Sequence, residues 1–180
     1  MTGVDPAEGM LDLARTKSVG LENPPTFIVG DAVNPPFPEA SFDAIVARYL
    51  LWTLREPHAA LATWRRLVKP GGRLAIVDGL WLDSGTSDAT YGVDEQDFHA
   101  TYGPSTLEAL TLAEATTIDE YTSIVTAAGF TDVTVRELPE LYEIEATHGQ
   151  AGDRLNVRMQ YLITATTPPT HGSPSAPTAR

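Results

Sequence analysis

Apolar and polar residues follow one another in blocks along the chain, and these blocks predict strands and helices in turn. Short apolar runs rich in β-branched residues are typical of strands buried in a parallel sheet. The strands predicted in the first half are one that ends at Asp5 and those at 26–29, 42–47 and 73–77. Helices are predicted between Asp5 and Gly20, and from Pro57 to the turn Lys69-Pro70-Gly71-Gly72.

The first predicted helix carries the pattern of a capping box. Asp5 is the expected N-cap, Pro6 suits the first helical position, and Glu8 stands three residues after the cap. The apolar face of this helix is expected to consist of Met10, Leu11, Leu13 and Ala14.

At residues 79–116 the regular succession of predicted strands and helices is interrupted. Trp81, Tyr91, Phe98 and Tyr102 stand there among Ser, Thr, Gly and Asp, and a helix is expected from about Leu107 to Ala115. The regular elements predicted after it are a helix capped by Thr117 and Glu120 and ended by Gly129, and alternating strands at 131–137 and 156–164.

The order of elements predicts an α/β fold with a mostly parallel sheet and helices on both faces. The last two strands are expected to form an antiparallel hairpin at one edge of that sheet. We expect one domain over residues 1–165, and a disordered tail over residues 166–180, which hold four prolines with Ser, Thr and Gly.

Composition excludes several classes of protein. The formal net charge of −12 disfavours nucleic acid and anionic membranes as partners, because both need a positive field. The chain has no cysteine, which excludes disulfides and thiolate chemistry. No signal peptide and no apolar run of about 20 residues is visible, so a cytoplasmic protein is expected. The four histidines show no metal-ligand spacing, so no metal site is predicted.

Four motifs in a fixed order carry a family resemblance. They are Gly3-Val4-Asp5, Gly30-Asp31-Ala32, Phe42-Asp43-Ala44-Ile45-Val46, and Leu67-Val68-Lys69-Pro70-Gly71-Gly72-Arg73-Leu74. With this order and spacing the chain resembles a class I S-adenosylmethionine-dependent methyltransferase from residue 3 to about 78, and to about 165 with the last helix and strands. The resemblance implies a Rossmann-like sheet, and it implies S-adenosyl-L-methionine as cofactor.

The resemblance also implies a role for individual residues. Asp5, followed by Pro6, matches the acid that binds both ribose hydroxyls, and Asp31 matches the acid that accepts from the adenine amine. Ala32 and Met10 would border the adenine. The residues that would border the methionine part of the cofactor are Arg48 and Tyr49.

Each of these residues has a plainer alternative. Asp5 can serve only as a helix cap, Asp31 can bond its own backbone in a turn, and Met10 can belong to a helix core. Arg48 can form a surface or interface ion pair. The Lys69–Gly72 turn precedes a strand instead of opening a helix, so it is interpreted as structural and not as a phosphate loop.

No catalytic residue is assigned, because methyl transfer from a sulfonium depends mainly on proximity and orientation. The resemblance implies that residues 79–116 cover the substrate, and their aromatic residues hint at an apolar or planar acceptor. Asp94, His99 and Tyr102 are either general bases for that acceptor or ordinary loop residues.

One departure from the family is large. The family's first strand and its Gly-x-Gly-x-Gly turn have no counterpart in residues 1–180. That strand is central in the family's sheet, between the strand ending at Asp5 and the strand at 42–47. Those two strands are expected to keep unpaired inner edges or to pair with each other.

Three explanations for this departure remain open: a start at an internal methionine of a longer gene, which we favour, a gene remnant, or complementation by another polypeptide. We expect residues 1–180 to bind S-adenosylmethionine weakly, to be nearly inactive, and to self-associate through exposed strand edges.

The predicted function is therefore methyl transfer to a small molecule. A non-catalytic remnant or interaction module with the same fold is the first alternative. A nicotinamide-dependent oxidoreductase is less favoured, because the Tyr-x-x-x-Lys pattern of a short-chain dehydrogenase does not occur.

Overall fold

The computed structural model describes residues 1–80, 104–113, 115–148 and 159–169. The elements in chain order are β1 (Thr2–Asp5), α1 (Glu8–Lys17), β2 (Thr26–Val29), β3 (Phe42–Arg48), η1 (Leu51–Thr53), α2 (Pro57–Leu67), β4 (Val68–Gly79), α4 (Pro104–Leu107), α5 (Ile118–Ala127), β5 (Thr131–Glu137), α6 (Pro139–His148) and β6 (Gln160–Thr166). The α/β class predicted from the alternating pattern is confirmed.

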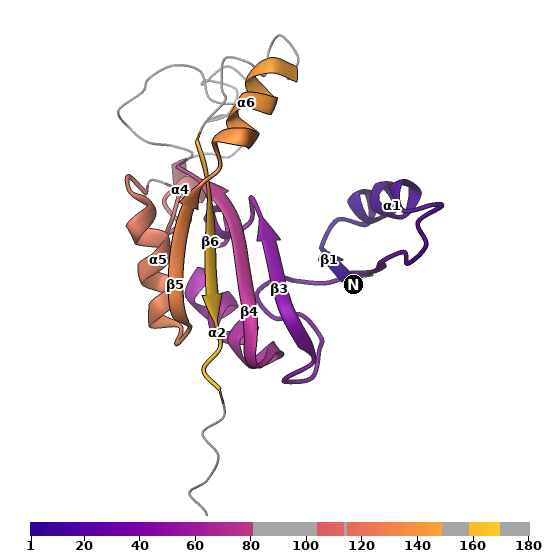
Figure 1. Ribbon diagram of the computed structural model, residues 1–180, viewed down its shortest axis with the longest axis horizontal. Helices are drawn as coiled ribbons and strands as arrows, with labels where there is room; N and C mark the ends of the chain where they lie inside the picture. Colours follow the sequence, from indigo (N-terminus) through magenta and orange to yellow (C-terminus); the bar gives the residue numbers. More distant parts are fainter. Residues whose placement is uncertain (81–103, 114, 149–158, 170–180) are drawn as a thin grey trace, which may run out of the picture.

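The strands form two separate sheets, which Figure 1 shows side by side. β1 and β2 pair in parallel, with Asp5 opposite Val29. The other sheet has the order β3-β4-β6-β5, in which β3 and β4 are parallel and β6 is antiparallel to both of its neighbours. The expected antiparallel pair at the edge is confirmed, although α6 and residues 149–158 separate its two strands along the chain.

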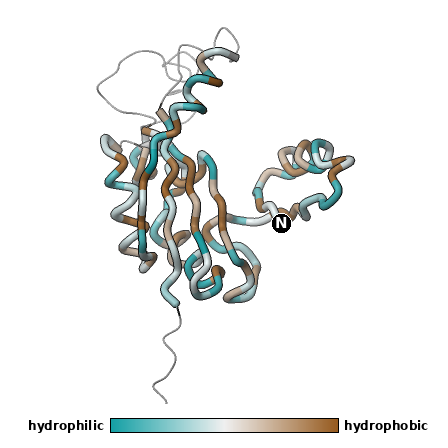
Figure 2. Tube along the Cα trace, viewed as in Figure 1, coloured by the Kyte–Doolittle hydropathy of each residue, from teal (hydrophilic) through white to brown (hydrophobic). Residues whose placement is uncertain are grey.

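The core lies between the four-stranded sheet and the helices α2 and α5; in Figure 1, α2 lies behind the sheet and α5 lies beside β5. Figure 2 shows apolar residues concentrated along β3, β4 and β6. Leu61 and Trp64 of α2 and Tyr121 of α5 are buried against Leu74 and Ile76 of β4. The spacing of Leu61 and Trp64 places both residues on one face of α2, the face that packs on the sheet.

Residues 69–72, interpreted from the sequence as a structural turn before a strand, form an irregular part of β4 itself, where the pairing with β3 shifts register. Gly71 has a φ of +74°, a region that favours glycine. A Cβ atom on Gly72 would lie 2.5 Å from Cγ1 of Val68 and 2.7 Å from the carbonyl oxygen of Asp43. Lys69 Nζ forms an ion pair with Asp43 Oδ1 at 2.7 Å, so this lysine links β4 to β3.

The expected cap of the first helix was wrong by two residues. The helix begins at Glu8, with Ala7 as N-cap, while Asp5 still belongs to β1. Asp5 Oδ1 accepts a hydrogen bond from the backbone N–H of Ala7 at 2.8 Å. Because the aspartate bonds the chain two residues ahead, it forms a turn between strand and helix instead of capping the helix.

Other boundaries also differ from the prediction. The helix expected from Leu107 to Ala115 is instead the short α4, and residues 108–113 form turns. The last strand continues through Thr166, and Thr167 is buried, with its hydroxyl donating to Lys69 O at 2.6 Å. The disordered tail was therefore predicted to begin too early, at residue 166. Thr166 still belongs to β6, and Thr167 is bonded to residue Lys69 of β4.

The inner edges of β1 and β3 do not pair with each other. β1 pairs with β2 and β3 pairs with β4, and among the described strands neither has a second partner. Figure 1 shows the β1–α1–β2 unit set apart from the four-stranded sheet and joined to it through residues 30–41. Of the two arrangements expected from the sequence, the structure therefore has unpaired inner edges.

Candidate functional site

Asp5 and Asp31 lie at the same end of the two-stranded sheet. Asp5 is the last residue of β1, and its carbonyl oxygen accepts from Gly30 N at 3.2 Å, directly before Asp31. Because β1 and β2 run in parallel, both aspartates follow the carboxyl ends of their strands. Ligands of open α/β sheets bind at this end.

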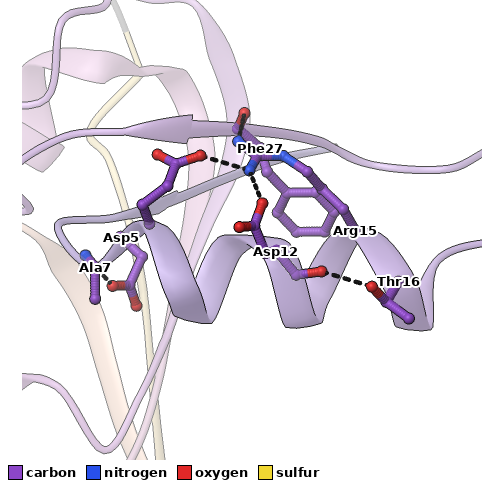
Figure 3. A network of polar contacts seen from close by, with 7 residues as sticks. Asp5, Ala7, Asp12, Arg15, Thr16 and Phe27 are labelled. Atoms are coloured by element: carbon purple, nitrogen blue, oxygen red, sulfur yellow. Dashed lines mark hydrogen bonds and ion pairs between the residues drawn. The ribbon is translucent and has the colours of Figure 1, made fainter.

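Each of the two carboxylates uses one oxygen for a local turn. Asp5 Oδ1 accepts from Ala7 N, as Figure 3 shows, and Asp31 Oδ1 accepts from Val33 N at 2.8 Å. The turn role considered for Asp31 is therefore present, whereas the helix-cap role of Asp5 is not. Among the contacts of the described residues, Oδ2 of both aspartates has no hydrogen bond, so each group retains an acceptor for a ligand.

The neighbouring acids of α1, Glu8 and Asp12, both form ion pairs with Arg15. Its Nη1 lies 2.7 Å from Glu8 Oε1 and 2.7 Å from Asp12 Oδ1, and its Nη2 donates to Phe27 O at 3.4 Å (Figure 3). Hydrogen bonds to Glu8 and Asp12 raise the pKa of Arg15 above its already high ordinary value. Arg15 is not bonded to Asp5, so the charge of Asp5 stays available.

The other predicted contacts of the adenosine half lie around this end. Pro6 and Met10 are exposed, and Met10 is 57% accessible, so its alternative role in a helix core is wrong. Leu11 is the buried residue of α1. The carbonyl oxygen of Ala32 accepts from Trp64 Nε1 at 2.7 Å, which ties the end of β2 to α2.

Arg48 and Tyr49 lie at the carboxyl end of β3, in a polar cluster on the other sheet. Arg48 Cζ is 4.3 Å from the centre of the Tyr49 ring, and Arg48 Nη2 donates to the Tyr49 hydroxyl at 2.8 Å. The ion pair considered for Arg48 is present, since its Nη2 lies 3.7 Å from Glu145 Oε1. Tyr49 has a φ of +53°, an uncommon value for a tyrosine.

Sequence reasoning did not include two members of this cluster, Glu145 and Gln160. The Tyr49 hydroxyl bonds Gln160 Oε1 and lies 3.1 Å from Glu145 Oε1, while Gln160 Nε2 donates to Glu145 Oε2 at 2.8 Å. Burial raises the pKa of Tyr49 above its ordinary value, which keeps the phenol protonated at neutral pH. Gln160 falls inside the strand predicted at 156–164, but the sequence carries no sign of its burial, and its partner comes from α6, which had not been predicted.

Asp78 lies near the carboxyl end of β4, a position that is visible in the sequence, and its role is structural. Its side chain is buried and accepts from the backbone N–H groups of Leu51 at 3.1 Å and Trp52 at 3.4 Å. A third bond, at 3.0 Å, comes from Gly79 N. Through these hydrogen bonds Asp78 holds η1 against β4.

A cavity of about 480 Å³ lies between β1 and β3. Of the predicted cofactor contacts, only Ala32 lines it. The other lining residues are Met1, Thr2, Gly3, Val4, Pro35, Phe37, Phe42, Ala44, Ile45, Val46, Ala47, Leu50, Trp64 and Leu67.

Part of the predicted site lies outside the described residues. Asp94, His99 and Tyr102, the candidate bases, belong to residues 81–103, so the expected acceptor cover has no structural description. Within the described ranges, no three His, Asp or Glu side chains come together in a way that could hold a metal ion. None of the helices described there combines the length and apolar character that a membrane span requires.

Sequence similarity to known proteins is found in the first half of the chain. Residues 1–76 match the family described as "Methyltransferase domain". Demethylmenaquinone methyltransferase of Renibacterium salmoninarum is 35% identical over 78 residues, which is 43% of this chain and 31% of that protein. The chain thus spans about a third of the length of the curated relatives that it matches.

Solved structures extend the likeness to nearly the whole chain. Phosphoethanolamine N-methyltransferase 2 of Haemonchus contortus, in complex with S-adenosylhomocysteine, superposes with a TM-score of 0.63 at 20% identity, over 93% of this chain and 43% of its own. The 4+2 cyclase SpnF has a TM-score of 0.60 at 22% identity, over 93% of this chain and 66% of its own. At such identities the likeness establishes the fold, and a fold alone does not determine the reaction.

These findings confirm the resemblance that the four sequence motifs predicted. The chain has the fold of the class I S-adenosylmethionine-dependent methyltransferases, and residues 1–76 match a methyltransferase domain.

Proposed function

We propose that this protein is an enzyme that transfers a methyl group from S-adenosyl-L-methionine to a small-molecule acceptor. The observation that carries this proposal is the placement of Asp5 and Asp31 at the carboxyl ends of two paired parallel strands, within the part of the chain that matches a methyltransferase domain. The cofactor, when bound, supplies a sulfonium methyl group.

The residues present at this end suit the adenosine half of the cofactor. Oδ2 of Asp5 is an acceptor for a ribose hydroxyl, and Oδ2 of Asp31 is an acceptor for the adenine amine. Pro6, Met10 and Ala32 are the apolar residues that would lie against the ring. The exposure of Met10 supports this role, because a methionine outside the core is free to cover a planar ligand.

On the other sheet, Arg48 and Tyr49 are proposed to border the methionine half. The guanidinium is stacked on the tyrosine ring and paired with Glu145, so its position is already set before any ligand binds. A fixed cation suits a carboxylate ligand because little conformational entropy is lost on binding.

The acceptor is proposed to be a small planar molecule. Curated relatives are named demethylmenaquinone methyltransferases, and the sequence places four aromatic residues between 79 and 116. The strongly acidic chain disfavours nucleic acid as acceptor. The proposed place of action is the cytoplasm.

Calorimetric titration with S-adenosylhomocysteine tests the assignment of Asp5. Replacing Asp5 by Asn should weaken binding by about tenfold to a hundredfold, which corresponds to one charge-assisted hydrogen bond of about 1.5–3 kcal/mol. Asp12→Asn is the matched control, because Asp12 is an exposed acid on the next helix that pairs with Arg15. Equal affinities of the two variants would remove Asp5 from the site.

A further inference from the structure

Helix α6 lies at the carboxyl ends of β3, β4 and β5, and Figure 1 shows it beyond these ends of the four-stranded sheet. The residue before the helix, Leu138, donates its backbone N–H to Gln160 O at 2.8 Å, which ties the start of α6 to the start of β6. Ligands of open α/β sheets bind at the carboxyl ends of the strands. Side chains that α6 directs toward the sheet therefore lie at its ligand-binding end.

Glu145 is the side chain of α6 that reaches the end of β3. Its Oε2 accepts a hydrogen bond of 2.8 Å from Gln160 Nε2, and its Oε1 lies 3.1 Å from the Tyr49 hydroxyl and 3.7 Å from Arg48 Nη2. A carboxylate can accept about four hydrogen bonds, and the Glu145 side chain is still 37% exposed. Its position is thus set by partners from two strands, while room remains for a ligand to reach it.

The backbone at Tyr49 adds an independent sign of function. Its φ of +53° is uncommon for a tyrosine, and its N–H is tied to Val77 O at 2.9 Å. Residues in such sparsely populated conformations persist where their surroundings hold them, and they cluster at functional sites. The strained residue here is the one that contacts both Arg48 and Glu145.

Within this cluster, Glu145 is the group that can take up a proton. The amide of Gln160 and the guanidinium of Arg48 are not bases at neutral pH. Burial raises the pKa of Tyr49, so its phenol stays protonated and serves as a hydrogen-bond donor. The nearby guanidinium disfavours a cationic amine as ligand and favours an oxygen that becomes negative as it loses its proton.

We propose that Glu145 is the general base of this site and accepts the proton of a hydroxyl group on the methyl acceptor. This inference rests on the proposed function, in which Arg48 and Tyr49 border the methionine half of the cofactor. Glu145 contacts both of these residues, so it lies next to the half of the cofactor that carries the methyl group. The acceptor class that fits this arrangement is a small planar alcohol, such as a phenol.

The proposed step keeps atoms and charges in balance. The acceptor oxygen forms a bond to the methyl carbon while the carbon–sulfur bond breaks, and the electron pair of that bond stays on sulfur. The hydroxyl proton moves to Glu145, which then releases it to water through its exposed side. Arg48 stabilises the negative charge that develops on the acceptor oxygen during the transfer.

Binding of 2-naphthol and of its methyl ether tests this role without any turnover, because the two probes differ in the O–H group. Residues 1–180 should bind the naphthol about tenfold or more tightly than the ether, since only the naphthol donates a hydrogen bond to a carboxylate. Titrations followed by naphthalene fluorescence measure both affinities.

Glu145→Gln should reduce this preference to about twofold or less, because the amide lacks the negative charge. Its affinity for the ether should equal that of the parent chain, which shows that the variant is folded. Glu143→Gln is the matched control: Glu143 is an exposed acid on the same helix, and residues two apart on a helix do not face the same side. This control should keep the full preference.

A preference that Glu145→Gln retains would overturn the role of Glu145, as would equal binding of the two probes by the parent chain. The parent chain is also titrated with S-adenosylhomocysteine. If it does not bind this compound, the proposed function is contradicted. If it binds the compound but does not prefer the naphthol, only the assignment of Glu145 is contradicted.

Discussion

The indole Nε1 of Trp64 in α2 donates a hydrogen bond of 2.7 Å to the carbonyl oxygen of Ala32, just beyond β2. Trp64 also belongs to the core of the four-stranded sheet. One side chain therefore anchors the two-stranded unit, which carries Asp5 and Asp31, to the rest of the molecule.

Replacing Trp64 by Phe should lower the free energy of unfolding by about 1–3 kcal/mol, because the carbonyl loses its partner and the core loses volume. Urea denaturation followed by circular dichroism measures this loss. Tyr142→Phe, at an exposed position of α6, is the control and should change stability little. A midpoint for Trp64→Phe equal to that of the control would mean that the anchor contributes nothing.

Replacing Gly72 by Ala should destabilise the fold by about 1–3 kcal/mol, since the new Cβ collides with the backbone of Asp43 and with Val68. Gly9→Ala is a matched control, because Gly9 lies in α1 with nothing within 4 Å of its added Cβ. That control should stabilise the chain by up to about 1 kcal/mol through helix propensity. Thermal unfolding measures both variants: the melting temperature should fall for Gly72→Ala and rise for Gly9→Ala.

Glu120 should make stability depend on pH. Its Oε1 accepts from the backbone N–H groups of Thr116 at 2.8 Å and Thr117 at 3.2 Å, and these bonds lower the pKa of Glu120. A lowered folded-state pKa contributes stability above the unfolded pKa, and that stability is lost as the pH falls through the folded value.

At neutral pH, Glu120→Ala should therefore cost about 0.3–1 kcal/mol at the start of α5. The difference from the parent chain should shrink as the pH falls below the ordinary pKa of glutamate and through the lower folded-state pKa of Glu120. Urea midpoints across this range measure the effect. Glu143→Ala, at an exposed position of α6, is the control, and a constant difference for Glu120→Ala at all pH values would contradict the prediction.

The sequence by itself determined the elements whose causes are local. The apolar run of β2 and the alternating pattern of β5 identified both strands to the residue, and Pro57 identified the start of α2, because β-branched residues and Pro at the first helical position act within a few residues. The capping box of α5 was likewise read correctly from Thr117 and Glu120. Asp5 at the end of β1 and Asp31 just after β2 were also identified from the local sequence.

Tertiary structure alone decided the features that depend on distant partners. Asp5 bonds Ala7 instead of capping a helix, because β1 holds it extended against β2. Tyr49 meets Glu145 and Gln160 across more than ninety residues of sequence, a contact that no local pattern encodes. The free edges of β1 and β3 face a common cavity only after both sheets have formed. The sequence left two arrangements of these inner edges open, and the structure decided between them, because pairing between strands is a long-range interaction.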